Sequence, residues 1–200
     1  MYIGQPITSS EINRLSSKGR KSIKPIYAPS EKQLQLMDGM LDYYVGLGSQ
    51  VQYAVTLQTK LVVCRGAGLA DKQRISLEDD FRVFAKRLQR EVYGMAHRRK
   101  PGKFSLMLLP SLEGSMFSPE GRRTLHYHVA IGNVPADMSA DKLRKTIWDQ
   151  WAKSAYGQMD IKFKPANEGW LSYITKEMEH GNTRCCDWGN TFVPECALRP

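Results

Sequence analysis

Residues 125–131 read Leu-His-Tyr-His-Val-Ala-Ile, and this stretch determines most of what we expect of the fold and the chemistry. Its alternating pattern predicts a β-strand, because successive side chains of a strand point to opposite faces. Leu125, Tyr127, Val129 and Ile131 then face the core, whereas His126 and His128 share the other face, about 7 Å apart at their Cα atoms. Two imidazoles at this spacing can reach one metal ion. Because the chain has only 4 His, a metal site is favoured over the alternative of two surface histidines without a ligand.

The sequence on either side of this strand changes repeatedly between helical and strand periodicity. Helices are predicted at residues 30–45, 76–92, 139–155 and 167–179, strands at 51–58, 104–109, 124–131 and 159–164, and a polar loop at 65–74. Each strand has an apolar and a more polar face, whereas strands of all-parallel sheets are usually apolar on both faces. The sequence therefore predicts an α+β fold. Its central sheet would be mainly antiparallel, with four to five strands, helices on one face and an active site on an open polar face.

The composition indicates a folded chain with a polyanionic partner. The chain has 200 residues, 42% hydrophobic residues and a formal net charge of +9. A basic excess of this size indicates nucleic acid or an acidic membrane surface. No apolar run reaches transmembrane length, and the N-terminus lacks the apolar core of a signal peptide. We therefore expect a cytoplasmic protein that uses no membrane.

The chain divides into three regions. Residues 1–49 form an N-terminal basic arm and a first helix, residues 50–180 the main domain with the histidines, and residues 181–200 a C-terminal tail. The basic run from Lys18 to Lys24 is either a solvated tail or a DNA contact. Cysteines stand at positions 64, 185, 186 and 196. The C-terminal cysteines could bind zinc together with His180, but reduced thiols in a cytosolic protein explain them more simply.

A metal site on the His126–His128 face needs a third ligand. Glu113 follows the preceding strand, and a hairpin would bring it beside His126; Glu120 is the other candidate. The alternative for Glu113 is a solvated loop carboxylate. Two imidazoles and one carboxylate leave coordination positions open, as a catalytic metal site requires.

A second group of candidate residues lies in the segment Gly-Trp-Leu-Ser-Tyr-Ile-Thr-Lys-Glu at 169–177. On a helix, Tyr173 and Lys176 project about 60° from each other. Trp170, Ile174 and Met178 form the buried side of that helix, and Tyr173 lies at its edge. Taken alone, this pattern favours a packing tyrosine.

A His-hydrophobe-His strand, followed downstream by a helix with Tyr-x-x-Lys, resembles the HUH endonucleases. In that superfamily the tyrosine precedes the histidine pair in conjugative relaxases and follows it, as here, in rolling-circle replication initiators. Residues 53–57, an apolar strand ending around a threonine, look like the family's first motif, and the resemblance covers about residues 51–180. The middle residue of the pair is Tyr127 rather than an aliphatic residue. Position 177 is Glu, which matches the single-tyrosine branch.

The resemblance implies an activity and roles for particular residues. His126 and His128 would bind Mg²⁺ or Mn²⁺, Tyr173 would be the nucleophile and Lys176 an accessory cation. The enzyme would nick and rejoin single-stranded DNA through a 5′-phosphotyrosine intermediate, and so start rolling-circle replication of a plasmid, phage or other mobile element. Its partners would be a replication origin with a hairpin and the host helicase and polymerase, because the sequence after residue 180 is too short for a helicase domain.

Basic side chains suggest a path for the DNA. Lys162 and Lys164 alternate with apolar residues and could line the polar sheet face, and further basic residues flank strand ends: Arg98, Arg99, Lys100, Arg122 and Arg123. Each of them could equally be a solvated charge. Three other functions stay open: a single-tyrosine HUH transposase, a non-catalytic nucleic-acid-binding domain and a zinc-dependent hydrolase.

Overall fold

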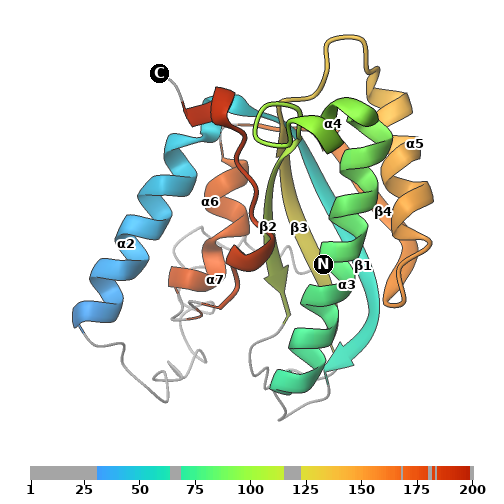
Figure 1. Ribbon diagram of the computed structural model, residues 1–200. Helices are drawn as coiled ribbons and strands as arrows, with labels where there is room; N and C mark the ends of the chain where they lie inside the picture. The colour runs from blue at the N-terminus through green and yellow to red at the C-terminus, as the bar shows by residue number, and fades with distance from the viewer. Residues whose placement is uncertain are drawn as a thin grey trace, which may run out of the picture.

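The chain folds around one antiparallel sheet in the computed structural model, which describes residues 31–63, 69–114, 123–167, 169–179, 182 and 184–198. The sheet of these described residues has four strands in the order β2-β3-β1-β4. The strands are β1 (Val51–Val63), β2 (Met107–Glu113), β3 (Arg123–Gly132) and β4 (Gly157–Pro165), and every neighbouring pair is antiparallel. The expected α+β fold with a mainly antiparallel sheet is confirmed (Figure 1).

Helices pack on the sheet from two sides (Figure 1), so the expectation of helices on one face only was wrong. The longer ones are α2 (Glu31–Gly46), α3 (Asp71–Tyr93) and α5 (Ala140–Trp151). The short helices are α4 (Met95–Arg99), α6 (Trp170–Ile174), α7 (Lys176–Glu179), η1 (Gly48–Gln50), η2 (Trp188–Asn190) and η3 (Glu195–Leu198). Ser139 caps α5 as its position predicts, because its side chain accepts a hydrogen bond from the backbone N–H of Lys142.

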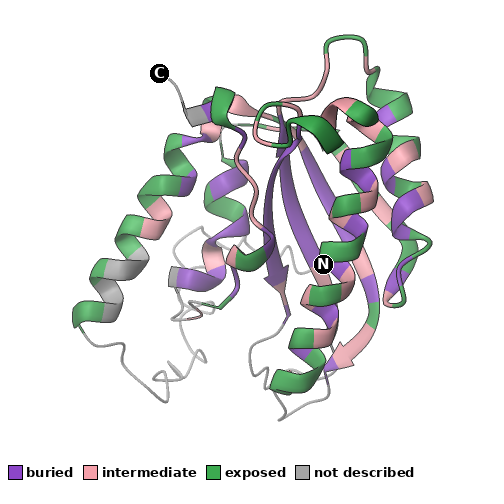
Figure 2. Cartoon of the chain, in the orientation of Figure 1, coloured by how far each residue is buried: buried purple, intermediate pink, exposed green. Residues whose placement is uncertain are grey.

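The main core lies between one face of the sheet and helices α3 and α5. The odd-numbered residues of β3 from 125 to 131 contribute to it, as their alternation predicts, together with Val55 and Leu57 of β1. Phe81 and Phe84 of α3 and Trp151 of α5 fill the space above them. The buried band along the strands in Figure 2 follows this packing.

The face that carries the histidines has an apolar cluster at one end. Ala54 and Ala130 on this face pack with Tyr44 of α2 and with Trp170 and Ile174 of α6. The two alanines lack bulk, so α6 can lie close to the strands. This face is therefore covered beside Ala54 and Ala130 and becomes more polar beyond them, from Thr56 and His128 onward.

Several boundaries differ from the sequence-based expectation: β1 extends to Val63, five residues past its predicted end, and α5 ends at Trp151, four residues before its predicted end. Helix α3 begins at Asp71, inside the predicted polar loop, because the hydroxyl of Ser76 bonds to the carbonyl of Lys72 within the helix instead of capping it. Strand β2 runs from Met107 to Glu113, three or four residues later than predicted. The single helix predicted over residues 167–179 is divided at Thr175, whose hydroxyl donates to the carbonyl of Leu171 at 2.9 Å.

The C-terminal segment is part of the fold. Phe192 exchanges two backbone hydrogen bonds of 2.8 Å with Leu108, and Leu112 donates to the carbonyl of Cys185 at 2.7 Å. Residues 185–192 therefore run along the outer side of edge strand β2 and satisfy its free backbone groups. Cys185 and Cys186 are buried there as free thiols. Cys64, His180 and the basic arm at residues 18–24 lie outside the described residues.

None of the described helices combines the length and the apolarity that crossing a bilayer would require.

Candidate active site

Two neighbouring strands bring Glu113, His126 and His128 together. Strand β3 places both histidines on one face, and its register with β2 sets Glu113 opposite His126 and Ser111 opposite His128. Paired residues of antiparallel strands project to the same face. The pairing of β2 with β3 therefore places Glu113 beside the histidine pair, as the hairpin expected from the sequence predicts.

The three side chains converge on one point. Oε2 of Glu113 lies 2.6 Å from Nε2 of His128 and 3.5 Å from Nε2 of His126, and the two Nε2 atoms are 3.1 Å apart. Ligands at neighbouring corners of a six-coordinate ion with bonds of about 2.1 Å lie about 3 Å apart. Two imidazoles and a carboxylate with this spacing fit a metal ion, and they are the one group of three such ligands among the described residues.

The protonation states of these residues also suit a cation. Burial raises the pKa of Glu113, but hydrogen bonds from His126, His128 and Lys176 outweigh it and hold that pKa well below its usual range. Burial lowers the pKa of His128 and outweighs the attraction of Glu113. An ionised carboxylate and a neutral imidazole are the forms that bind metals.

Thr56 of β1 contacts the ring nitrogen of His128 that does not face Glu113, and so orients the ring. Its Oγ1 lies 3.1 Å from Nδ1 of His128, and both side chains are buried. When Nδ1 carries the proton and donates to Thr56, Nε2 is left with its lone pair available to a metal ion, in place of the hydrogen bond that it otherwise donates to Glu113. Such outer contacts fix the tautomer and the ring orientation of metal-binding histidines. The sequence indicated Thr56 only as the end of an apolar strand. Its place on the polar face of that strand is the sequence feature that could have identified it as a neighbour of the histidines.

Tyr173 and Lys176 complete the site from α6 and α7. The ring of Tyr173, 44% exposed, lies 5.1 Å from the ring of His128 and stacks on Trp170 at 5.4 Å. Nζ of Lys176 lies 3.8 Å from the centre of the Tyr173 ring and 2.8 Å from Oε2 of Glu113. Burial lowers the pKa of Lys176, but contacts with Glu113 and Tyr173 outweigh it and raise that pKa. Tyr173 therefore contacts one potential metal ligand, His128, and Lys176 contacts both Tyr173 and a second potential ligand, Glu113.

Glu177 holds the two halves of this site together. It is buried, and its carboxylate accepts hydrogen bonds from the backbone N–H of Gly114, at 3.0 Å, and from Asn182, at 2.7 Å. Gly114 directly follows Glu113 and has a φ of 87°, which favours glycine. A second anchor is the hydroxyl of Ser111, which donates to the carbonyl of Ile174 at 2.6 Å. These bonds fasten α6 and α7 to the strand that carries Glu113.

A groove of about 640 Å³ opens in front of these residues. Lys162 and Lys164 of β4, both exposed, line it as predicted, with Trp170 between them and Tyr173. Lys164 also lies 5.5 Å from the centre of the Trp170 ring. Gln58 and Asn167 line the same groove, and the sequence reading did not single them out.

Arg98 and Arg99, also predicted as DNA contacts, are not among the residues that line this groove. Arg98 and Arg99 are exposed at the end of α4, before the first residue of β2, whereas Glu113 is the last residue of that strand. Arg123 belongs to β3, but its side chain is not described. Arg122 and the alternative ligand Glu120 lie outside the described residues.

The fold and the site define an α+β protein with a His-His-Glu group that could hold a metal ion. No protein-family model, curated protein or solved structure matches the chain, so its function has to be argued from this geometry.

Proposed function

We propose that this protein is a metal-dependent endonuclease that nicks and rejoins single-stranded DNA with Tyr173 as its nucleophile, and that it initiates rolling-circle replication of a mobile element. The observation that carries the proposal is the contact of an exposed tyrosine with both a potential metal ligand, His128, and a lysine cation, Lys176. A tyrosine that served only to pack the helix would not require an ion pair between that lysine and Glu113 beside it.

Each part of the site has a role in phosphoryl transfer. Glu113, His126 and His128 would hold the ion, with Mg²⁺ or Mn²⁺ as the proposed metals. A bound divalent cation supplies charge withdrawal from an oxygen of the scissile phosphate. Lys176 stabilises the negative charge that develops on the phenol oxygen of Tyr173 as the phenol loses its proton to solvent.

The bonds exchanged in this reaction balance. The phenol oxygen of Tyr173 attacks phosphorus, and the bond between phosphorus and the 3′-oxygen of the upstream nucleotide breaks. The products are a 5′-phosphotyrosine link and a free 3′-OH, which takes its proton from water. Because one phosphodiester replaces another, a 3′-OH can later reverse the step and rejoin the strand. Such an enzyme can both start and end a round of replication.

The groove has the chemistry of a single-strand site. Lys162 and Lys164 provide positive charge for phosphates, and the aromatic rings of Trp170 and Tyr173 lie against the same space. Basic grooves with aromatic side chains bind single strands largely independently of sequence. The net charge of +9 adds attraction at longer range.

Formation of a covalent adduct tests the proposal. Wild-type protein is incubated with Mn²⁺ and a library of labelled single-stranded oligonucleotides with a randomised centre, and we expect a DNA-linked species that survives SDS. Tyr173→Phe should abolish it. Tyr43→Phe is the matched control, because Tyr43 of α2 is 43% exposed but does not line the groove, and it should form the adduct as the wild type does.

Each outcome discriminates between functions. An adduct that persists in Tyr173→Phe overturns the assignment of the nucleophile. DNA binding without an adduct in the wild type indicates a non-catalytic nucleic-acid-binding domain. An adduct that forms only on DNA with a hairpin near an element end, by a protein that is dimeric in solution, indicates a transposase.

A further inference from the structure

A second hollow adjoins the candidate active site beyond His126. It has a volume of about 610 Å³ and is lined by Gln58, Thr124, His126, Gln158, Met159 and Asp160. Gln58 and His126 line both this hollow and the groove of the active site, so the two are continuous. Tyr173 lines only the active-site groove, where it contacts His128. Along β3, the tyrosine thus lies at the His128 end of the site and the second hollow at the His126 end.

The charge along β4 changes sign between these two spaces. Residues 158, 160, 162 and 164 read Gln, Asp, Lys and Lys; Lys162 and Lys164 line the active-site groove, whereas Gln158 and Asp160, at the register shift between β1 and β4, line the second hollow. The register sets Lys164 opposite Ala54 and Lys162 opposite Thr56, level with the active site. Gln158 and Asp160 follow toward the second hollow, and the described residues that line it include no lysine or arginine.

The lysines beside the active site and the carboxylate beside the second hollow match the two parts of a nucleotide, its phosphate and its base. Lysines attract phosphates, whereas a carboxylate repels them and accepts hydrogen bonds from base edges. Gln58 and Gln158 add amide groups that both donate and accept, and Met159, which is 52% exposed, offers an apolar surface. The second hollow therefore suits a nucleobase and disfavours the DNA backbone.

We propose that this hollow binds the base of the nucleotide whose 3′-oxygen is released, and that it selects bases with an exocyclic amino group. This inference rests on the proposed endonuclease function. In phosphoryl transfer the attacking and leaving oxygens lie roughly in line through phosphorus. With Tyr173 attacking from the His128 end, the 3′-oxygen leaves toward the His126 end, and the base of its nucleotide lies at Asp160.

Asp160 supplies the selectivity. An ionised carboxylate only accepts hydrogen bonds, so it pairs with the amino groups of cytosine, adenine and guanine. Thymine lacks an exocyclic amino group, and its one Watson–Crick donor, N3–H, lies between two carbonyl oxygens that repel the carboxylate. One good side-chain-to-base contact contributes about 1–3 kcal/mol of discrimination, or about 5-fold to 150-fold.

The cleavage products themselves report the selected base. A single-stranded library with a fixed 5′ segment and a randomised centre is cleaved with Mn²⁺, and the released fragments with a free 3′-OH are sequenced. Their last base is the one that occupied the hollow. For the wild type we expect thymine at this last position to be depleted about tenfold or more relative to the library.

Two variants and one control complete the experiment. Asp160→Asn gains an amide that can donate to thymine, so the depletion should shrink to within about twofold. Gln158→Ala should weaken the selection in part, and it tests the hollow independently of Asp160. Asp137→Asn changes an exposed carboxylate that does not line either space, and it should keep the wild-type profile.

The outcomes separate this inference from the proposed function. Fragments that end in all four bases equally, or a profile that is unchanged in both variants, overturn the base site while the endonuclease stands. If the wild type releases no fragment and forms no adduct, the endonuclease proposal fails and the base site fails with it.

Discussion

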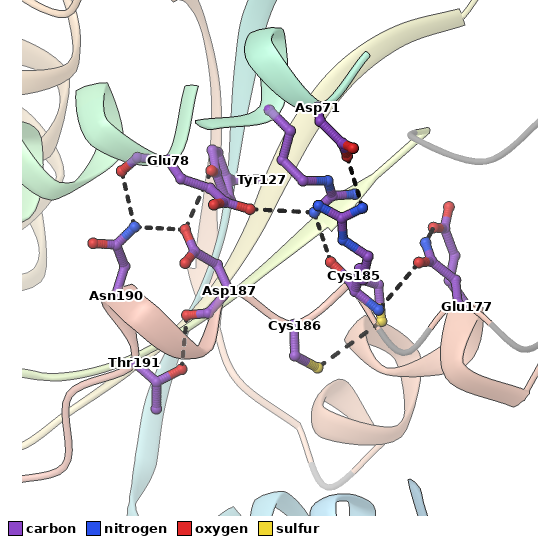
Figure 3. A network of polar contacts seen from close by, with 12 residues as sticks. Asp71, Glu78, Tyr127, Glu177, Cys185, Cys186, Asp187, Asn190 and Thr191 are labelled. Atoms are coloured by element: carbon purple, nitrogen blue, oxygen red, sulfur yellow. Dashed lines mark hydrogen bonds and ion pairs between the residues drawn. The ribbon is translucent and has the colours of Figure 1, made fainter. Parts of the chain in front are cut away.

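The buried carboxylate of Asp187 predicts a measurable dependence of stability on pH. Asp187 belongs to the C-terminal segment and is 5% exposed, and it accepts hydrogen bonds from Asn190 at 2.7 Å and from Tyr127 at 3.3 Å (Figure 3). Burial raises the pKa of Asp187 from 3.8 to about 6, and the nearby charge of Glu78 adds to this effect. The two hydrogen bonds lower the pKa but do not compensate for burial.

The size of the effect follows from the two pKa values. A difference of about two pH units corresponds to about 3 kcal/mol, at 1.36 kcal/mol per unit. Because the folded protein binds this proton more tightly than the unfolded chain, the contribution to stability is fully present below pH 3.8 and is lost as the pH rises through about 6. Above that pH the wild type carries the whole cost of a buried charge.

Replacing Asp187 with Asn isolates this contribution. The amide oxygen can still accept hydrogen bonds from Asn190 and Tyr127, but the side chain stays neutral at every pH. The free energy of unfolding is measured in urea from pH 4 to 7.5 for both proteins, and taking their difference removes the contribution of other titrating groups. We expect this difference to shift by about 3 kcal/mol in favour of Asp187→Asn, mainly between pH 4 and 6.

Asp42→Asn is the control for this measurement, because Asp42 is an exposed carboxylate of α2. Its difference from the wild type should vary by less than about 0.5 kcal/mol over the same range, as is usual for exposed sites. A difference between Asp187→Asn and the wild type that is constant from pH 4 to 7.5 would refute the reasoning, since it would mean that Asp187 is as easily ionised in the fold as in the unfolded chain.

Two further substitutions test the electrostatics of the metal site. Thr56→Val keeps the shape of the side chain but removes the contact with Nδ1 of His128, and it should weaken Mn²⁺ binding by about 10-fold to 100-fold in a calorimetric titration; unchanged affinity would exclude this orienting role. Lys176→Met removes a cation that lies 2.8 Å from the carboxylate of Glu113, so it should raise Mn²⁺ affinity about fivefold, by about 1 kcal/mol of relieved repulsion, while it decreases the yield of the DNA adduct. A loss of both metal and adduct in Lys176→Met would mean that the lysine holds Glu113 in place.

The sequence predicted the parts of the site that depend on strand periodicity. The alternation in residues 125–131 was enough to put both histidines on one face, because a buried sheet face allows only one register of side chains. The hairpin argument offered Glu113 as a ligand, with Glu120 as the other candidate, and the register places Glu113 opposite His126. The contact of Tyr173 with Lys176 also agrees with a spacing of three residues, although the helix is divided at Thr175 between them.

Tertiary contacts decide the features that the sequence did not predict. The helix predicted to begin at Ser76 begins five residues earlier, and the hydroxyl of Ser76 bonds to the carbonyl of Lys72 inside α3. Residues 185–192 lack periodicity because they are held by backbone hydrogen bonds to β2, which any side chains allow. The contact of Thr56 with His128 joins residues that are 72 positions apart, and it requires the pairing of β1 with β3.

The second apolar cluster explains why the site lies where it does on the sheet. Ala54 and Ala130 allow α6 to approach the strands, and Trp170 fills the space above them and stacks on Tyr173. Tyr173, the proposed nucleophile, is thereby fixed at the edge of the covered region, next to His128. Larger side chains at positions 54 and 130 would push α6 away from the strands. Tyr173 would then lie farther from the potential metal ligands, although none of these residues had been changed. The small side chains of this sheet face therefore help to position Tyr173, just as the hydrogen bonds of Thr56 and Glu177 help to position His128 and helix α7.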